Sequence, residues 1–256
     1  PLVADVAITG MGALSPLGIG VEAMWRGLVA GKSGVHRISF FDPSEFPCQI
    51  AGEVDDFDAP ALLGERLARR TDRYVQFSIV AAKQALADAG LELTDELRDR
   101  VGIFIGSAIG GITTLYEQMQ ILEERGPRRV SPFLIPMMIP NMAAGQVAIE
   151  TGAAGPNMSQ VSACASGAHA IGEAAETIAR GDAVAMLAGG SEAAITRIGL
   201  AGFCQGRALS TGRNAEPATA SRPFDAGRDG FVPSEGAGIL VLEDLEFARK
   251  RGARIH

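Results

Sequence analysis

The sequence predicts an α/β fold in which a mixed sheet is covered by helices on both faces. Short apolar, β-rich runs alternate along the chain with segments whose apolar residues recur at helical spacing. Most of the expected strands are apolar on both faces, which is typical of strands buried between two layers of helices. Glycine accounts for 32 of the 256 residues and aromatic residues for only 5%, so we expect close packing through small side chains.

The first part of the chain supplies one strand and two helices. Residues 4–12 form a short β-rich run that ends in glycines, as a buried first strand does, and residues 20–32 carry apolar positions at helical spacing. Residues 38–60 are rich in proline and aspartate, so we expect a loop with at most a short strand. Residues 73–90 are the clearest helix, because their apolar positions share one face and a glycine caps the C-terminus.

The remainder repeats the alternation around a single cysteine. A continuous apolar strand over 100–111 runs into a glycine-rich turn, and a helix follows at about 113–125. Prolines disrupt the start of 131–152, so we expect a helix there only from about residue 141. The last expected elements are a strand at 157–163, a helix at 166–180, a strand at 182–193, a long polar loop at 208–231, and a strand and helix within 235–253.

Composition argues against several classes of function. The net charge of -7 disfavours a general nucleic-acid-binding or anionic-membrane surface. The 3 cysteines form neither an even disulfide framework nor a zinc-binding CxxC pair, which fits free thiols in a reducing cytosol. The N-terminal residues lack the layout of a signal peptide, and no apolar run approaches the length of a membrane span. We therefore expect a cytoplasmic protein with no metal centre and no nucleic-acid or membrane partner.

The stretch VSACASGAHAIGEA, residues 161–174, places Cys164 where an apolar strand turns into a helix rich in alanine and glycine. Backbone N–H groups at a helix start have no intrahelical partner, and together with the positive helix end they favour thiolate over thiol. The same groups can stabilise an oxyanion formed from a thioester carbonyl. Ala163 and Ala165 leave room for a reacting carbon, and Ser166 can cap the helix. On geometry alone, Cys164 is either a nucleophile or an ordinary buried cysteine.

His169 is the nearest candidate for a base, but its spacing from Cys164 is unfavourable. Five residues of α-helix correspond to about 500° of rotation, which leaves the two side chains about 140° apart. We therefore predict that His169 is structural. His36 lies in a loop flanked by glycine and His256 is the last residue, so neither offers an evident partner. The candidate site is incomplete.

The cysteine stretch is one of several motifs in the chain. Four further motifs occur in order: VAITGMGALSPLG (6–18), AMLAGGSEA (185–193), GRALST (206–211) and RPFDAGRDGFVPSEGAGILVLE (222–243). Together they resemble the N-terminal part of the β-ketoacyl-acyl-carrier-protein synthases, the elongating condensing enzymes. The resemblance implies a thiolase-like fold of two similar α/β halves, with residues 1–256 as the N-terminal half and the nucleophile on a buried helix.

The resemblance also implies a reaction. Cys164 would accept an acyl group from the phosphopantetheine of acyl carrier protein, with no cofactor of the protein's own. A decarboxylative Claisen condensation with malonyl-carrier protein would follow in fatty acid elongation, carried out by a homodimer. The family's two catalytic histidines, buried lysine and Gly/Phe gate belong to the C-terminal half, and none of those motifs occurs here. We therefore expect the C-terminal half to be absent from this chain, and the segment alone to be inactive.

Four positions match the family's acyl-chain pocket. Ile109 matches a pocket-lining residue, Gly199 and Phe203 match the far wall, and Leu134 matches a residue that reaches the neighbouring subunit's pocket. Without the resemblance, each would be interpreted as ordinary core.

Four arginines match a basic patch that docks the acidic carrier protein: Arg66, Arg69, Arg70 and Arg207. Taken alone, the first three are typical of a solvated helix face. On an acidic protein, such a patch would steer an acidic partner toward the site.

Three other interpretations stay open. The chain is alternatively a non-catalytic partner or scaffold half-domain that binds carrier protein, although the retained Cys164 counts against this. A polyketide-type ketosynthase has the same motifs. A thiolase has the same fold and a cysteine but coenzyme A substrates, and the motifs at 206–211 and 222–243 favour a synthase. Cys48 and Cys204 lack the surroundings of a nucleophile, so we expect them to be structural.

Overall fold

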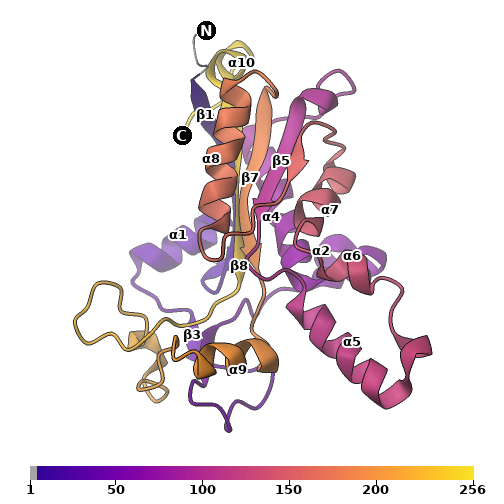
Figure 1. The fold of residues 1–256 in the computed structure, drawn as a ribbon. Coiled ribbons are helices and arrows are strands. Elements are labelled where there is room, and N and C mark those ends of the chain that lie inside the picture. Colours follow the sequence, from indigo (N-terminus) through magenta and orange to yellow (C-terminus); the bar gives the residue numbers. More distant parts are fainter. Residues whose placement is uncertain (1–4) are drawn as a thin grey trace.

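A mixed sheet of 6 strands forms the centre of the molecule in the computed structural model, which describes residues 5–256 (Figure 1). The strand order is β2-β1-β8-β7-β5-β6, with β5 parallel to β6 and β7, and with β8 antiparallel to β7 and β1. A separate pair, β3 and β4, lies outside it. The strands are β1 (Val6–Ser15), β2 (Gly18–Ile19), β3 (Val35–Arg37), β4 (Ile50–Gly52), β5 (Val101–Gly106), β6 (Asn157–Met158), β7 (Ala185–Glu192) and β8 (Gly236–Asp244).

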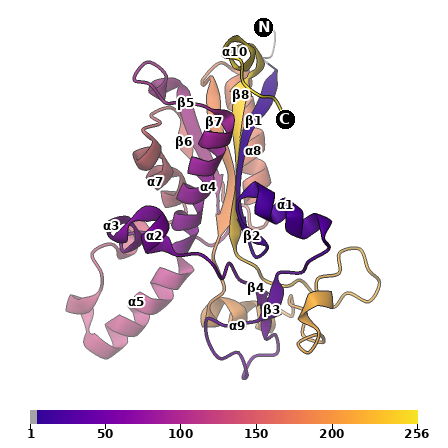
Figure 2. The same cartoon turned by 180° about the vertical axis from the view of Figure 1, so that it is seen from behind.

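Helices cover both faces of the sheet, as the apolar strands predict. Helix α8 (Ser166–Ala179) lies on one face, and α4 (Arg73–Ala89) lies on the other with α7 (Met142–Thr151) beside it (Figures 1 and 2). Neighbouring residues of β7 point to opposite faces of the sheet, because side chains alternate along a strand. Leu187 belongs to the core under α4, whereas Met186 belongs to the core under α8. The predicted α/β class is confirmed.

The remaining helices surround this centre. In Figure 1, α5 and α9 lie toward the end of the sheet opposite the chain termini, and α10 lies beside the termini. Among residues 5–256, no helix is long and apolar enough to span a membrane. The bounds are α1 (Val21–Val29), α2 (Ala59–Leu63), α3 (Glu65–Ala68), α5 (Ile112–Arg125), α6 (Leu134–Met138), α9 (Arg197–Gln205) and α10 (Leu245–Lys250).

The contact between β1 and α4 shows why the interior needs small residues. A Cβ atom on Gly12 would lie 1.9 Å from the carbonyl oxygen of Ala81, and one on Gly10 would lie 2.2 Å from that of Ala85. Strand and helix backbones are therefore in direct contact. This arrangement confirms the close packing that the glycine content predicts.

Several boundaries differ from those predicted. Residue 4, where the first strand was expected to begin, lies outside the described residues, and β1 extends further, to Ser15. The strand expected at 157–163 is only Asn157–Met158, because the Ser159 hydroxyl then donates to the Ile105 carbonyl and the chain begins to turn. The helix ending in Gly90 is confirmed, with that glycine in the left-handed region at φ 56.

Short helices occur where loops were expected. α2 begins inside the proline-rich loop, because the Asp58 carboxylate accepts a hydrogen bond from the Ala61 N–H and Pro60 suits the first turn. α6 lies among the prolines expected to exclude regular structure. Its Pro136 falls in the first turn, where the missing N–H has no intrahelical partner to lose. α9, also not predicted, is capped by the Thr196 hydroxyl.

Candidate active site

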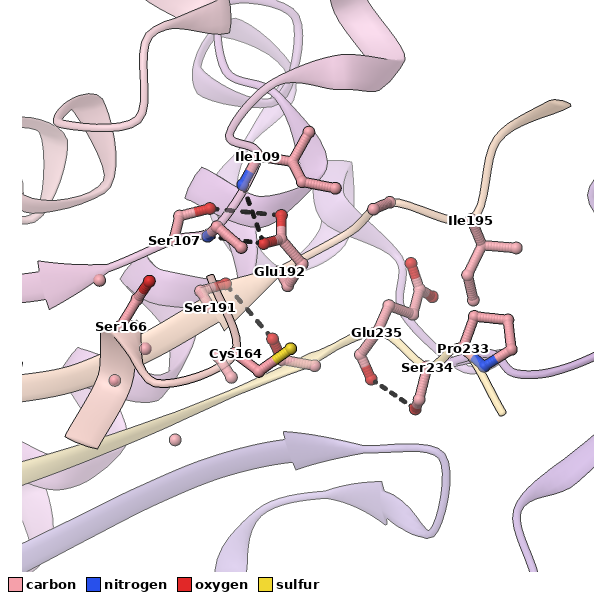
Figure 3. Close-up of a pocket in the computed structure, with 18 of the residues that line it drawn as sticks. Ser107, Ile109, Cys164, Ser166, Ser191, Glu192, Ile195, Pro233, Ser234 and Glu235 are labelled. Carbon is pink, nitrogen blue, oxygen red and sulfur yellow. Dashed lines mark hydrogen bonds between the residues drawn. The ribbon is translucent and has the colours of Figure 1, made fainter. Parts of the chain in front are cut away.

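Cys164 lies in a tight turn between β6 and α8. Ala163 before it has φ 54, a left-handed backbone conformation that is uncommon for a residue with a Cβ atom. Such strain clusters at functional sites, where the surrounding structure enforces it. The Cys164 side chain is exposed and lines a cavity of about 570 Å³ (Figure 3). The turn therefore presents the sulfur to an open cavity.

The turn is held by its own hydrogen bonds. The Ser162 N–H donates to the Ser166 hydroxyl at 2.9 Å, and that hydroxyl donates to the Ala163 carbonyl at 2.6 Å. The N–H groups of Ala165 and Ser166 donate to the carbonyls of Ser162 and Ala163. The expected capping by Ser166 is wrong: Ala165 is the N-cap residue, it makes no side-chain cap, and Ser166 is the first helical residue. The Ser166 hydroxyl instead stabilises the turn through its two hydrogen bonds.

Glycines allow the start of α8 to lie directly on the sheet. A Cβ atom on Gly106, the last residue of β5, would lie 2.4 Å from backbone atoms of Ser166. One on Gly190 of β7 would lie 3.0 Å from the Cα atom of Gly167. Cys164 is consequently placed at the carboxyl ends of two parallel strands, where ligand sites of α/β sheets usually lie.

The inner and outer sides of α8 differ in exposure. Ala170, Ala174 and Ile178 face the sheet and are buried, whereas Gly172 and Glu173 are exposed. The expected burial of the nucleophile helix therefore holds only for its inner side within the described residues.

The histidines of the chain have other partners. His169 Nδ1 is 2.7 Å from the Ser162 hydroxyl oxygen, and no hydrogen bond joins His169 to Cys164 within residues 5–256. His36 pairs with Asp55 at 3.1 Å, and His256 lies 3.2 Å from Asp88. These contacts agree with the prediction that His169 is not the base for Cys164.

Two carboxylates line the same cavity, and sequence reasoning missed both. Glu192, at the end of β7, accepts hydrogen bonds from the N–H groups of Ala108 and Ile109, and burial raises the pKa of its carboxyl group. Glu235 is only 4% exposed and pairs with the Arg73 guanidinium, with Nε at 2.8 Å. The sequence did hold a signal for each of these carboxylates. Glu192 ends an apolar strand, and Glu235 directly precedes a strand that begins with glycines.

Two of the four predicted pocket residues reach the cavity. Ile109 and Phe203 both line it with Cys164. Gly199 does not: its N–H donates to the Thr196 hydroxyl, and an added Cβ atom would lie 2.6 Å from the Ala194 carbonyl oxygen. Its role is to shape the start of α9, which carries Phe203. Leu134 begins α6, half-buried, and does not line this cavity.

Three of the four predicted docking arginines lie together. Arg66, Arg69 and Arg70 are exposed and, with Glu65, line a shallow depression of about 340 Å³. Arg69 pairs with Glu65 at 3.1 Å, and the Arg70 guanidinium lies 4.8 Å from the centroid of the Phe133 ring. Arg207 is exposed after α9 and does not line this depression.

The other two cysteines fit their expected structural roles. Cys48 is completely buried, its thiol donates to the Ile50 carbonyl at 3.5 Å, and burial raises the pKa of that thiol. Cys204 is half-buried in α9 and packs against the same core cluster as Cys48. Among the described cysteines, only Cys164 is exposed.

One group of side chains has the ligand types of a metal site. Ligand atoms of His36, Glu53 and Asp55 lie within 4.8 Å of one another. The Glu53 carboxylate already accepts hydrogen bonds from the Ser39 N–H and hydroxyl, and His36 Nδ1 lies 2.8 Å from the Arg37 carbonyl oxygen. Hydrogen bonds within the protein thus account for this cluster. The absence of a metal centre stays a prediction.

Comparison with known proteins identifies the family of the chain. Residues 4–248 match the family model described as "Beta-ketoacyl synthase, N-terminal domain". The chain is 50% identical over 251 residues to 3-oxoacyl-[acyl-carrier-protein] synthase 2 of Staphylococcus aureus (strain N315), covering 98% of this chain and 60% of that protein. It is 49% identical to the protein of the same name from a Synechocystis strain, with the same coverage. The chain thus spans about 60% of the length of these curated relatives.

Solved structures share the fold. A β-ketoacyl synthase from Burkholderia phymatum STM815 superposes with a TM-score of 0.88 at 37% identity, covering 99% of this chain and 62% of the other. A ketosynthase bound to a hexaketide, in complex with its type II polyketide acyl-carrier protein, gives a TM-score of 0.83 at 33% identity, covering 98% and 61%. The expected thiolase-like fold is confirmed. The chain belongs to the β-ketoacyl synthase family and corresponds to its N-terminal domain.

Proposed function

We propose that the protein is a β-ketoacyl-acyl-carrier-protein synthase, an acyltransferase of fatty acid elongation, with Cys164 as its acyl acceptor. The observation that carries the proposal is the exposed Cys164 thiol, presented by a strained turn to a cavity of about 570 Å³. Relatives 49–50% identical over almost the whole chain are named 3-oxoacyl-[acyl-carrier-protein] synthase 2, which supports the same reaction.

The proposed chemistry has two steps. The Cys164 thiolate attacks the thioester carbonyl of an acyl-carrier protein, the bond to the phosphopantetheine sulfur breaks, and phosphopantetheine leaves as its thiolate. Malonyl-carrier protein then loses CO2, and the resulting carbanion attacks the Cys164 thioester. A carbon–carbon bond forms, the bond to Cys164 breaks, and the free thiolate is regenerated. The protein needs no resident cofactor for this, because phosphopantetheine carries the substrates.

The residues that line the cavity suit an acyl chain. Ile109 and Phe203 are the proposed contacts of the chain bound at Cys164, and Ile195, Phe231 and Val232 extend the apolar wall. Gly199 acts through the backbone of α9 rather than by contact. A contact from Leu134 to the neighbouring subunit is proposed as part of a homodimer.

Carrier protein is the proposed partner. The depression between Arg66, Arg69 and Arg70 offers exposed guanidinium groups to an acidic surface, and Arg207 adds a further charge after the end of α9. One structural neighbour is a ketosynthase in complex with an acyl carrier protein, which supports this assignment. We propose a cytoplasmic location and no nucleic-acid or membrane partner.

The groups for decarboxylation are proposed to come from outside residues 1–256. Each histidine within the described residues already pairs with a partner other than Cys164. The isolated chain should therefore accept an acyl group but not condense it. Turnover of malonyl-carrier protein by this chain at the rate of a complete synthase would contradict that.

A polyketide-type ketosynthase is the second candidate, favoured by the neighbour bound to a hexaketide at 33% identity. The higher identity to the named fatty acid synthases favours elongation. A scaffold function is disfavoured by the retained, exposed Cys164.

Assays on the full protein with acyl- and malonyl-carrier protein test the proposal. We expect a 3-oxoacyl product, its loss in Cys164→Ala, and its retention in the matched control Cys204→Ala. Product formation by Cys164→Ala would exclude the proposed nucleophile.

A further inference from the structure

We propose that Glu192 is a positioning residue: it holds the turn 107–110 in place, and so sets the length of acyl chain that the Cys164 cavity accepts. The effect on acyl chain length rests on the proposed function, whereas the support of the turn by Glu192 concerns the structure alone. Glu192 lies at the end of β7, on the edge of the cavity and directly beside the 107–110 turn (Figure 3).

The contacts of Glu192 account for the whole turn. One carboxylate oxygen accepts from the Ala108 N–H at 2.8 Å and from the Ile109 N–H at 3.1 Å. The other accepts from the Ser107 hydroxyl at 3.3 Å. The Ser107 oxygen in turn accepts from the Gly110 N–H at 3.1 Å. Each residue from Ser107 to Gly110 is therefore tied to this one side chain, directly or through Ser107.

No regular element holds this segment. β5 ends at Gly106 and α5 begins at Ile112, so the N–H groups of Ala108 and Ile109 have neither a strand nor a helix partner. Both donors are partly buried, and a backbone donor shielded from water without an acceptor is costly. Glu192 supplies that acceptor from a different strand.

The other side of the turn rests on α6. The Gly111 N–H donates to the Met138 carbonyl at 3.0 Å, and a Cβ atom on Gly111 would lie 2.3 Å from the Met137 carbonyl oxygen. The turn is thus held between α6 and Glu192. Ile109 within it lines the cavity beside Cys164. Loss of the bonds to Glu192 would therefore let Ile109 move in the cavity wall, while the Gly111 bond to α6 keeps the other end of the turn in place.

To hold the turn, residue 192 needs correctly placed hydrogen-bonding atoms rather than a negative charge. The hydrogen-bond donors to Glu192 are backbone N–H groups and one hydroxyl, with no lysine or arginine among them in the described residues. A glutamine can reproduce the set, because its carbonyl oxygen accepts from both N–H groups and its amide nitrogen can donate to the Ser107 oxygen. An alanine removes every one of these bonds.

The test compares Glu192→Ala with Glu192→Gln in the full protein, with Glu92→Ala as the control at an exposed glutamate. Amide hydrogen exchange of residues 107–111 is the first measurement. We expect exchange at Ala108 and Ile109 to be roughly tenfold faster in Glu192→Ala and near wild type in the other two variants.

The second measurement is acylation of Cys164 by pantetheine thioesters of increasing chain length. Glu192→Ala should shift the ratio of long-chain to short-chain kcat/KM by roughly threefold or more, mainly through KM, and Glu192→Gln should keep the wild-type ratio. Ser107→Ala removes two hydrogen bonds of the set, the one to Glu192 and the one from the Gly110 N–H. It should speed amide exchange at Gly110. It replaces Glu192→Ala in the test if that variant does not fold.

The outcomes separate the two levels of the claim. Wild-type exchange and chain-length preference in Glu192→Ala would overturn the inference, and so would a glutamine variant that behaves like alanine. If Cys164 of the wild-type protein accepts no acyl group, the proposed function fails instead. The exchange measurement still decides whether Glu192 holds the turn.

Discussion

Helices α4 and α8 flank the same sheet and are both rich in small residues, yet they end in different surroundings. In α4, Ala81, Ala82 and Ala85 are all buried, and α7, which lies beside it, and α2 both contact it. In α8, the outer side with Gly172 and Glu173 is exposed within the described residues. One face of the sheet is therefore covered by several packed helices, whereas the helix on the other face, which follows Cys164, has an exposed outer side.

The two helix starts differ in the same way. The Asp72 carboxylate caps α4 by accepting from the Tyr74 N–H, and it also accepts from the Thr114 N–H and hydroxyl, which ties α4 to α5. At α8, Ala165 provides no side-chain cap, and Cys164 precedes it. One N-terminus holds the fold together and the other is left available for a reacting group. The predictions that follow test this division.

The largest expected effect is at the contact between β1 and α4. In Gly12→Ala the new methyl group would lie 1.9 Å from the Ala81 carbonyl oxygen, so strand and helix must separate. We expect a loss of at least about 3 kcal/mol in the free energy of unfolding, because backbone atoms cannot yield as a side chain does. Denaturant unfolding would measure it. A variant as stable as wild type would contradict the close packing of this face.

Removal of the α4 cap should have the next largest effect. Asp72→Ala should cost about 2 kcal/mol, because the cap and the bonds to Thr114 are lost. Burial raises the pKa of the Asp72 carboxyl above its ordinary value of 3.8. As pH rises from that value, the unfolded chain ionises first, so the wild-type advantage over Asp72→Ala should shrink up to the folded pKa. Unfolding curves from about pH 4 to about pH 7 would reveal the trend. An advantage that grows over this range would argue against it.

The smallest effect should have the opposite sign. An added Cβ atom on Gly172, in the middle of α8, meets nothing within 4 Å. Gly172→Ala should therefore stabilise the isolated chain by about 1 kcal/mol through helix propensity. If another part of the full protein covers this side of α8, the same substitution should give no gain there. Melting temperatures of both forms would compare them, and destabilisation of the isolated chain would mean that this face is already packed.

The sequence predicts best what depends on neighbouring residues. Helix α4 and its Gly90 cap follow from local periodicity, and the sequence also places Cys164 just before a helix, although the strand expected before it ends at Met158. The short helices α2 and α9 were missed, although Asp58 and Thr196 are ordinary capping residues, because α2 has only 5 residues and α9 carries Gly199 and Gly202, which are weak helix formers.

Long-range contacts account for the rest. The bond from Ala108 to Glu192 joins residues 84 positions apart, and it exists because β5 and β7 pair in parallel with Gly106 opposite Gly190. No local pattern specifies that register. The exclusion of Gly199 from the cavity likewise depends on how α9 is capped and packed, which its motif alone does not reveal.

The most direct test of the account is where an acyl group attaches. The full protein would be incubated with an acyl-pantetheine thioester, digested and mapped by mass spectrometry, with the half-buried Cys204 as an internal comparison. We expect the adduct on Cys164, none on the buried Cys48, and no adduct in Cys164→Ala. Acylation of Cys204 or Cys48 with Cys164 unmodified would contradict the assignment of Cys164 as the acyl acceptor.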